Sequence, residues 1–414
     1  MQDTELYRHL LGIASPWTVS KVNLDLEKQR VDVWADHPSG QLWPCPVCGD
    51  LTPLYDHSEE RTWRHLDSCQ FKTFLHAKPP RIACPKDGVR QVNIPWAEAK
   101  SRFTMLFERM AIDVMQVTHT AAARKIMRIS WDEAWHIIER AVARGKLRKK
   151  PRSISHIGVD EKGISKGHRY FTLVCDIKQS TVEHIADGRE KASFQSYLDN
   201  LTPEQLEAIE AVGMDMHEPF VQAALAKIPN AADKIVFDRY HIMQHMGRAV
   251  DEVRKHENRA LMAEGDKRLA KTKYLWLYGK ENLPARYWER YYELRSSDLK
   301  TARAWAIKEN LRHLWSYKMR RWGESHWRQW YRWAIRSKLE PVVKVARTLK
   351  RHARNILSYF DHPITNAVAE GLNSRIEAIK NTARGYRNPE RFKTMIWFRL
   401  GGLDLYPSTH AIPG

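Results

Sequence analysis

Short apolar runs alternate with longer amphipathic stretches between residues 151 and 245, and this pattern predicts alternating strands and helices. Strands are expected where the apolar runs are short and bounded by turn residues. The predicted strands are 155–160, 169–176, 181–186, a run that ends at Asp215, and 232–238. The predicted helices cover about 191–209 and 220–228. This order indicates a mixed core of sheet and helices, in which functional side chains gather beyond the strand ends.

Helical spacing dominates residues 246–362, a stretch that holds eight of the 16 tryptophans. Most of these tryptophans are expected between helices, because large aromatic side chains dominate core packing. A further amphipathic helix is predicted around Glu370, with Glu370 and Asn373 on a face away from the apolar stripe. The apolar stripe is formed by Val368, Leu372, Ile376 and Ile379.

Two shorter helices are predicted at 118–127 and 131–142, joined by a turn at 128–130. Ser130 is a fair N-cap for the second helix, and acidic residues follow it near the positive end of the helix dipole. Small alanines allow the two helices to cross closely. The pattern therefore fits a helix-turn-helix as well as an ordinary helical hairpin. A basic run follows, in which Arg144, Lys146 and Arg148 either neutralise phosphates or form a solvated linker.

The chain of 414 residues carries 68 Lys and Arg against 49 Asp and Glu, a net charge of +19. Much of the excess lies in 241–360, which has 28 basic and 12 acidic residues. Such a distribution points to a polyanionic partner. The sequence shows no signal peptide and no apolar run of membrane-spanning length, so we expect a cytoplasmic, nucleoid-associated protein that makes no membrane contact.

Five cysteines are too few and too unevenly spaced for a disulfide scaffold, which favours metal binding. Cys45-Pro-Val-Cys48-Gly has the spacing of half a zinc knuckle, because two intervening residues let both thiolates reach one ion. Cys84-Pro-Lys-Asp87-Gly has the same form, with Asp87 at the position of the last ligand. We expect a structural Zn²⁺ on these four residues. The alternatives are that His65 or Cys69 completes the set, or that packing alone holds a degenerate knuckle.

Asp160, Asp215 and Glu370 are the leading catalytic candidates, because each lies at the end or on the face of a different predicted element. Converging carboxylates suit a pair of hard divalent cations such as Mg²⁺ or Mn²⁺. The competing interpretation is two turn residues and one solvated helix residue. Asn373 either holds the nearby glutamate in place or contacts DNA.

Several motifs resemble the insertion-sequence transposases of the ISL-three group, and the resemblance covers nearly the whole chain. The motifs are Gly158-Val-Asp160-Glu161, Lys166-Gly-His-Arg169-Tyr, Phe237-Asp238-Arg239-Tyr240-His241, and the stretch from Asn366-Ala-Val-Ala-Glu370-Gly-Leu-Asn373 to Arg384-Gly-Tyr386-Arg387-Asn388. The resemblance implies a DDE enzyme with the triad Asp160, Asp215 and Glu370. Asp238 is the alternative second aspartate, and His241 is a supporting residue.

By this resemblance the chain is an α+β multidomain protein with a ribonuclease-H-like core. The expected parts are a zinc-knuckle DNA-binding segment (1–100), a helix-turn-helix (101–150), the first part of the core (151–245), an all-helical insertion (246–362), and the Glu370 helix with a tail (363–414). The expected DNA contacts are Arg144, Lys146, Arg148, Asn373, Arg384, Arg387 and Arg391.

The expected function is cut-and-paste transposition, with element terminal repeats and target DNA as partners and a homodimer or larger assembly on DNA. One alternative is a DNA-binding regulator whose catalytic core has decayed. Another is a ribonuclease-H-like nuclease that acts on RNA or branched DNA, which a duplex-reading helix-turn-helix argues against.

Overall fold

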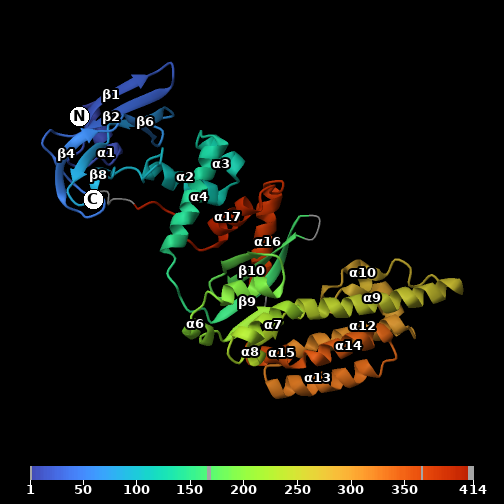
Figure 1. Ribbon diagram of the computed structural model, residues 1–414. Helices are drawn as coiled ribbons and strands as arrows, with labels where there is room; N and C mark the ends of the chain where they lie inside the picture. The colour runs from blue at the N-terminus through green and yellow to red at the C-terminus, as the bar shows by residue number, and fades with distance from the viewer. Residues whose placement is uncertain (1, 166–168, 365–366, 409–414) are drawn as a thin grey trace. The chain divides into compact units, whose positions relative to one another are not determined.

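The computed structural model describes residues 2–165, 169–364 and 367–408, and it divides into two compact units (Figure 1). One unit consists of Met1–Lys150 and Ile379–Gly414, and the other of Pro151–Ala378. Residues 166–168 and Asn366, which belong to the motifs quoted above, lie outside the described residues.

The N-terminal part of the first unit is built from two four-stranded sheets, with strand orders β1-β2-β6-β5 and β3-β4-β7-β8. The parallel pairing of β2 with β6 places Val33 beside Leu75, and both side chains are fully buried. The elements are α1 (Asp3–Leu10), β1 (Thr18–Asp25), β2 (Arg30–Asp36), β3 (Leu42–Pro44), β4 (Leu51–His57), β5 (Arg61–Arg64), β6 (Lys72–Ala77), β7 (Pro80–Cys84) and β8 (Gly88–Gln91).

Four helices complete the first unit: α2 (Met105–Val117), α3 (Thr120–Ile126), α4 (Trp131–Arg148) and α17 (Pro389–Leu400). The start of α4 is fixed by a capping box, in which Ser130 and Glu133 satisfy each other's backbone N–H groups. The C-terminal helix α17 packs against α4, so the end of the chain returns to this unit.

A five-stranded mixed sheet with the order β11-β10-β9-β12-β13 forms the centre of the second unit. The first three strands are antiparallel neighbours, whereas β12 runs parallel to β9 and β13 runs parallel to β12. The strands are β9 (His156–Ser165), β10 (Arg169–Asp176), β11 (Thr181–Asp187), β12 (Ala211–Met214) and β13 (Ile235–Phe237). Buried apolar residues of β9, β12 and β13 form one core with the covering helices.

The helix predicted over 191–209 is two helices, because Thr202 caps a new helix that begins at Pro203. The strand predicted over 232–238 is shorter than expected, because Ala231–Lys234 forms a helical turn before it. The helices between the strands are α5 (Lys191–Leu198), α6 (Pro203–Glu207), α7 (Glu218–Lys227) and α8 (Ala231–Lys234).

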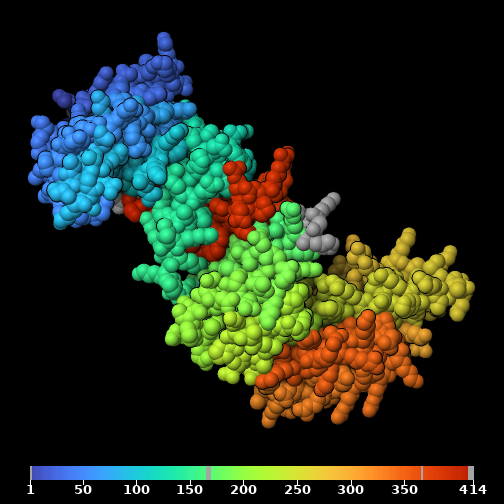
Figure 2. Space-filling view, viewed as in Figure 1, coloured from blue at the N-terminus to red at the C-terminus, as the bar shows by residue number. Residues whose placement is uncertain are grey.

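The helices between residues 239 and 360 form the yellow-to-orange lobe in Figure 2. Its main helix, α9, is 25 residues long and packs against α10, α12 and α14. As predicted, most of the eight tryptophans of this stretch pack in the core: Trp276, Trp305, Trp327 and Trp330 are buried, and Trp288 and Trp315 pack against them partly buried. Trp322 and Trp333 are exposed.

The elements of this lobe and the helix that follows it are α9 (Arg239–Ala263), α10 (Lys273–Leu277), η1 (Lys280–Asn282), η2 (Ala285–Tyr287), α11 (Trp288–Ser296), α12 (Lys300–Arg312), η3 (His313–Ser316), α13 (Arg320–Ile335), α14 (Glu340–Arg351), α15 (Ala353–Leu357), η4 (Ser358–Phe360) and α16 (Ala367–Thr382).

Candidate active site and metal centres

Three neighbouring parallel strands carry an aspartate at the same edge of the five-stranded sheet. Asp160 lies on β9, two residues beyond Gly158, the last residue that pairs with β12. Asp215 directly follows β12, and Asp238 directly follows β13 as the N-cap of α9. Since parallel strands end at the same edge, these carboxylates gather where mixed sheets of this kind place their functional groups.

His241, in the first turn of α9, lies between two of these aspartates. Its Nε2 atom is 2.9 Å from Oδ1 of Asp215 and 3.9 Å from Oδ2 of Asp238. The hydrogen bond with Asp215 is the main cause of a raised pKa for His241, so the imidazolium form is favoured. The histidine therefore offsets part of the negative charge at this edge.

The helix α16 brings Glu370 and Asn373 to the same place. Asn373 donates a hydrogen bond of 2.5 Å from Nδ2 to Oδ2 of Asp160. Glu370 is solvent-exposed at one side but close enough to Asp238 for the two carboxyl groups to interact. Partial burial, followed by the charge of Asp238, raises the pKa of Glu370. The structure thus brings together the five predicted catalytic and supporting residues, including both aspartates that competed for the second position, and places Asn373 beside them.

Burial, and after it the charge of a neighbouring carboxylate, raises the pKa values of Asp160, Asp238 and Glu370. Burial, and then the charge of Asp215, raises the pKa of Asp160 to about 7. Burial also raises the pKa of Asp238. Like charges held together in a partly buried site favour protonation or the binding of a cation. This electrostatic pattern is common at functional sites.

The donor set fits a hard divalent cation. Oδ1 of Asp215 and Oδ2 of Asp238 are both buried; Nε2 of His241 lies 2.9 Å from the first, and the second has no hydrogen-bond partner among the described residues. Ligand atoms of Asp215, Asp238 and His241 lie within 4.8 Å of one another. Buried carboxylate oxygens without a donor are the ligands that Mg²⁺ and Mn²⁺ take.

A second cluster, in the N-terminal segment, unites Cys45, Cys48, Cys84 and Asp87, with all ligand atoms within 4.8 Å of one another. Two turns of the same form supply them: each ends in a glycine with positive φ, Gly49 at 81° and Gly88 at 73°. Asp87 Oδ2 lies 3.3 Å from Cys45 Sγ and 3.5 Å from Cys84 Sγ. Hydrogen bonds from Cys48 and Cys45 lower the pKa of Asp87, so it is an anionic member of the set.

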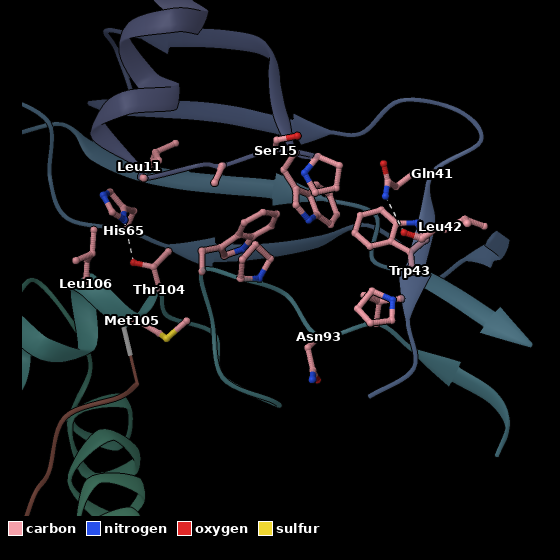
Figure 3. Close-up of a pocket in the computed structure, with 18 residues that line it drawn as sticks. Leu11, Ser15, Gln41, Leu42, Trp43, His65, Asn93, Thr104, Met105 and Leu106 are labelled. Atoms are coloured by element: carbon pink, nitrogen blue, oxygen red, sulfur yellow. Dashed lines mark hydrogen bonds between the residues drawn. The ribbon is translucent and has the colours of Figure 1, made fainter. Parts of the chain in front are cut away.

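The two alternative ligands for this cluster lie elsewhere. Figure 3 shows His65 beside Thr104 at one end of an apolar cavity of about 550 Å³, and its Nδ1 is 2.9 Å from Thr104 Oγ1. Burial lowers the pKa of His65 to about 4. Cys69 is exposed and is not part of the cluster. Among the described residues, Asp87 is therefore the residue that joins the three cysteines.

The basic residues after the second predicted helix are engaged within the first unit. Arg144 is buried, and its guanidinium donates to both carboxylate oxygens of Glu98 and to Glu108. Arg148 donates to Asp404 and to the Tyr406 carbonyl. The Nζ atom of Lys146 lies 4.6 Å from the centre of the Trp397 ring. The charge of Arg144 is therefore balanced inside the unit by the carboxylates of Glu98 and Glu108.

The other predicted DNA contacts differ in exposure. Arg384 and Arg387 are exposed in the loop between α16 and α17, and Arg391 lies on α17 with its guanidinium 5.0 Å from the Trp135 ring. The side-chain amide of Asn373 donates a hydrogen bond to Asp160. Sequence reasoning missed Trp131, Trp135 and Arg399, which line a cavity with these arginines. No local motif marks them, because they come from helices far apart in the sequence.

Two family models of known proteins match this chain. A family model of the ISL3 DDE type, described as "Transposase", matches residues 157–396 and so spans the carboxylate site. A second, described as the zinc-finger of the transposases of IS204, IS1001, IS1096 and IS1165, matches residues 41–87 and spans the cysteine cluster. The chain belongs to the ISL3 family of insertion-sequence transposases.

Similar proteins include the transposase for insertion sequence element IS1001 of Bordetella parapertussis, which is 27% identical over 360 residues, 86% of this chain and 88% of that one. The transposase for insertion sequence element IS1557 of Mycobacterium tuberculosis is 26% identical over 431 residues, 97% of this chain and 96% of that one. Within the described residues, none of the helices is both long and apolar enough to cross a membrane.

Proposed function

We propose that this transposase cuts the ends of its insertion sequence and joins them to target DNA in a cut-and-paste reaction. The observation that carries the proposal is the gathering of Asp160, Asp215, Asp238 and Glu370 at one edge of the sheet. The strand order β11-β10-β9-β12-β13, with three antiparallel strands followed by two parallel ones, supports a ribonuclease-H-like core.

Asp160, Asp215 and Glu370 are proposed to hold two Mg²⁺ or Mn²⁺ ions. When bound, such a pair lowers the pKa of a water molecule and stabilises the leaving oxygen of a phosphodiester. The carboxylates fit this role because Asp215 holds a buried carboxylate oxygen in a group of possible metal ligands, and burial together with the charge of Asp215 raises the pKa of Asp160. Asp238 and His241 are proposed as positioning residues for Asp215 and Glu370.

The protein's own groups orient the catalytic carboxylates before DNA arrives. Both oxygens of Asp160 accept hydrogen bonds, one from the Glu161 backbone N–H at 2.7 Å and one from Asn373 at 2.5 Å. In the proposed reaction, water hydrolyses the phosphodiester at the element end. The freed 3′-hydroxyl then attacks target DNA in line at the same carboxylates, with no covalent enzyme intermediate.

The first unit is proposed to recognise the terminal inverted repeats. Zn²⁺ held by Cys45, Cys48, Cys84 and Asp87 would fix the two knuckle turns. The helices α3 and α4, joined by a short turn, are proposed as a helix-turn-helix with α4 as the recognition helix. The basic helices of 246–362 are proposed to hold phosphates, and a homodimer or larger assembly is proposed to bring two element ends together.

Glu370→Gln tests this assignment, because it removes one charge without changing the size of the side chain. We expect Mg²⁺-dependent cleavage of end-containing DNA to fall to background while DNA affinity stays within about twofold. Glu252→Gln, an exposed glutamate on α9, is the matched control and should cut as the wild type does. Cleavage retained in Glu370→Gln would remove this residue from the catalytic set. Binding without cleavage in the wild type would indicate a regulator.

A further inference from the structure

A cavity of about 500 Å³ lies within the first unit, where the starts of α3 and α4 meet the end of α16, the following loop and α17. Its size is in the range of small-molecule pockets, ~300–1,000 Å³. Four arginines line it: Arg384, Arg387, Arg391 and Arg399. None of the described residues around it is an aspartate or a glutamate. The cavity is therefore suited to an anion.

Flat aromatic surfaces lie beside these arginines. Trp131 is 42% exposed, which is unusual for a large aromatic side chain, and it lies at the first position of α4. Trp135, one turn later, is buried, and its ring centre is 6.3 Å from that of Trp131. The guanidinium of Arg391 covers the Trp135 ring at 5.0 Å. Trp131 therefore offers a ring face, with cationic groups close by, to a planar ligand.

Two buried donors in the lining lack acceptors. The Nε1 atom of Trp135 and the Nε atom of Arg399 are buried and have no hydrogen-bond partner among the described residues. Another nitrogen of Arg399 already donates to the carbonyls of Met115 and Thr118, so the side chain is held in place. Buried donors without partners are rare in folded proteins, because each costs desolvation free energy. A ligand with acceptor oxygens or ring nitrogens would satisfy them.

We propose that this cavity binds one unpaired nucleotide of a DNA strand, with its base on Trp131 and its phosphate between Arg384 and Arg387. A nucleotide combines the three properties that the cavity selects: a planar ring, a negative charge and several acceptors. Stacking on an aromatic side chain together with arginine contacts is how proteins hold unpaired bases. The proposal rests on the proposed function, because only a protein that opens or cuts DNA meets such a nucleotide.

The test compares two duplexes of one sequence, one blunt and one with a single unpaired 3′ nucleotide carrying 2-aminopurine. Full-length wild type should bind the overhang duplex about tenfold more tightly and quench its fluorescence, as expected for one stacked base. Trp131→Ala should reduce the preference to within twofold. Trp322→Ala, which removes an exposed tryptophan of the other unit, is the matched control and should keep it. Arg387→Ala, at an exposed position, gives a second variant that should weaken overhang binding.

The source of the nucleotide is tested by competition with free deoxyadenosine monophosphate. The proposal is supported if unlabelled overhang DNA displaces the labelled overhang duplex and free deoxyadenosine monophosphate does not. Equal wild-type affinity for both duplexes, a preference retained in Trp131→Ala, or binding of free nucleotide without any preference for the overhang would overturn it. Asp160→Asn should keep the preference for the overhang duplex, because Asp160 belongs to the other unit and does not line the cavity. Loss of cleavage and loss of overhang binding are therefore separate results.

Discussion

Asn373 on α16 donates a hydrogen bond from Nδ2 to Oδ2 of Asp160 on β9, over 2.5 Å. Glu370 lies three residues before Asn373, which places both side chains on the same side of the helix. One hydrogen bond therefore connects the helix that carries the glutamate to the strand that carries the first aspartate. We interpret Asn373 as a positioning residue that sets the distance between two carboxylates proposed as catalytic.

Asn373→Ala should lower the rate of DNA cleavage by about 10- to 100-fold, the usual effect of losing a partner that orients a metal ligand. DNA affinity should change by less than about twofold. Cleavage rates and binding isotherms measured on the same DNA separate these effects. Ser374→Ala, at an exposed neighbouring position, is the control. A loss of affinity with an unchanged rate for bound DNA would instead make Asn373 a DNA contact.

Asp215→Asn should abolish cleavage, whereas Asp238→Asn should lower it by only about 10- to 100-fold. The reason is that Asp215 is proposed as a metal ligand and Asp238 as a residue that positions Glu370 and His241. Mg²⁺ titrations of cleavage by both variants give the measurement. The opposite ranking would identify Asp238 as the second catalytic aspartate.

The thiol cluster should hold one Zn²⁺ per chain, and Cys48→Ser should lose it. The sulfur of Cys48 lies 3.5 Å from that of Cys84 within the cluster, so its removal breaks the ligand set. Metal analysis of purified protein measures the stoichiometry, and thermal unfolding measures the lost stability. Cys69→Ser is the control, because Cys69 is exposed and outside the cluster. Zinc lost from Cys69→Ser but retained by Cys48→Ser would contradict the assignment.

His65 should make the N-terminal segment less stable as the pH falls from about 6.5 to 4. Burial lowers the pKa of His65 from 6.5 to about 4, so the unfolded chain takes up a proton before the folded one does. The stability is fully present above pH 6.5 and is lost on acidification, by up to about 3 kcal/mol. Urea unfolding of the wild type and His65→Gln across this range measures it. An equal pH dependence in both proteins would contradict this account.

Several strands and helix starts were predictable because local pattern determines them. The strand predicted at 169–176 coincides with β10, and the helix predicted from Trp131 begins there because Ser130 caps it. The break in the helix predicted at 191–209 is also a local feature, because Thr202 and Pro203 start a new helix there. The sequence prediction missed it because the residues on both sides have helical spacing. The return of α17 to α4 depends on contacts between distant parts of the chain, which periodicity does not report.

The carboxylates of the candidate site were predictable individually, because each aspartate follows or ends an apolar run. The residues that each carboxylate contacts were not predictable from the sequence. The choice between Asp215 and Asp238 looked exclusive in the sequence, yet β12 and β13 are adjacent parallel strands and bring both to one edge. The bond from Asn373 to Asp160 and the approach of Glu370 to Asp238 depend on how α16 packs. The spacing of residues in a helix predicts which side chains share one face of that helix. It does not predict which other element that face contacts.

The most direct test of the central claim uses purified wild type and Asp160→Asn on linear DNA that carries the native flanks of the gene. The reaction is followed with Mg²⁺ and again with EDTA. We predict discrete Mg²⁺-dependent cuts at both flanks by the wild type, and none by Asp160→Asn, which should still bind the DNA. Cuts by Asp160→Asn equal to those of the wild type, or specific binding without any cut by the wild type, would contradict the account.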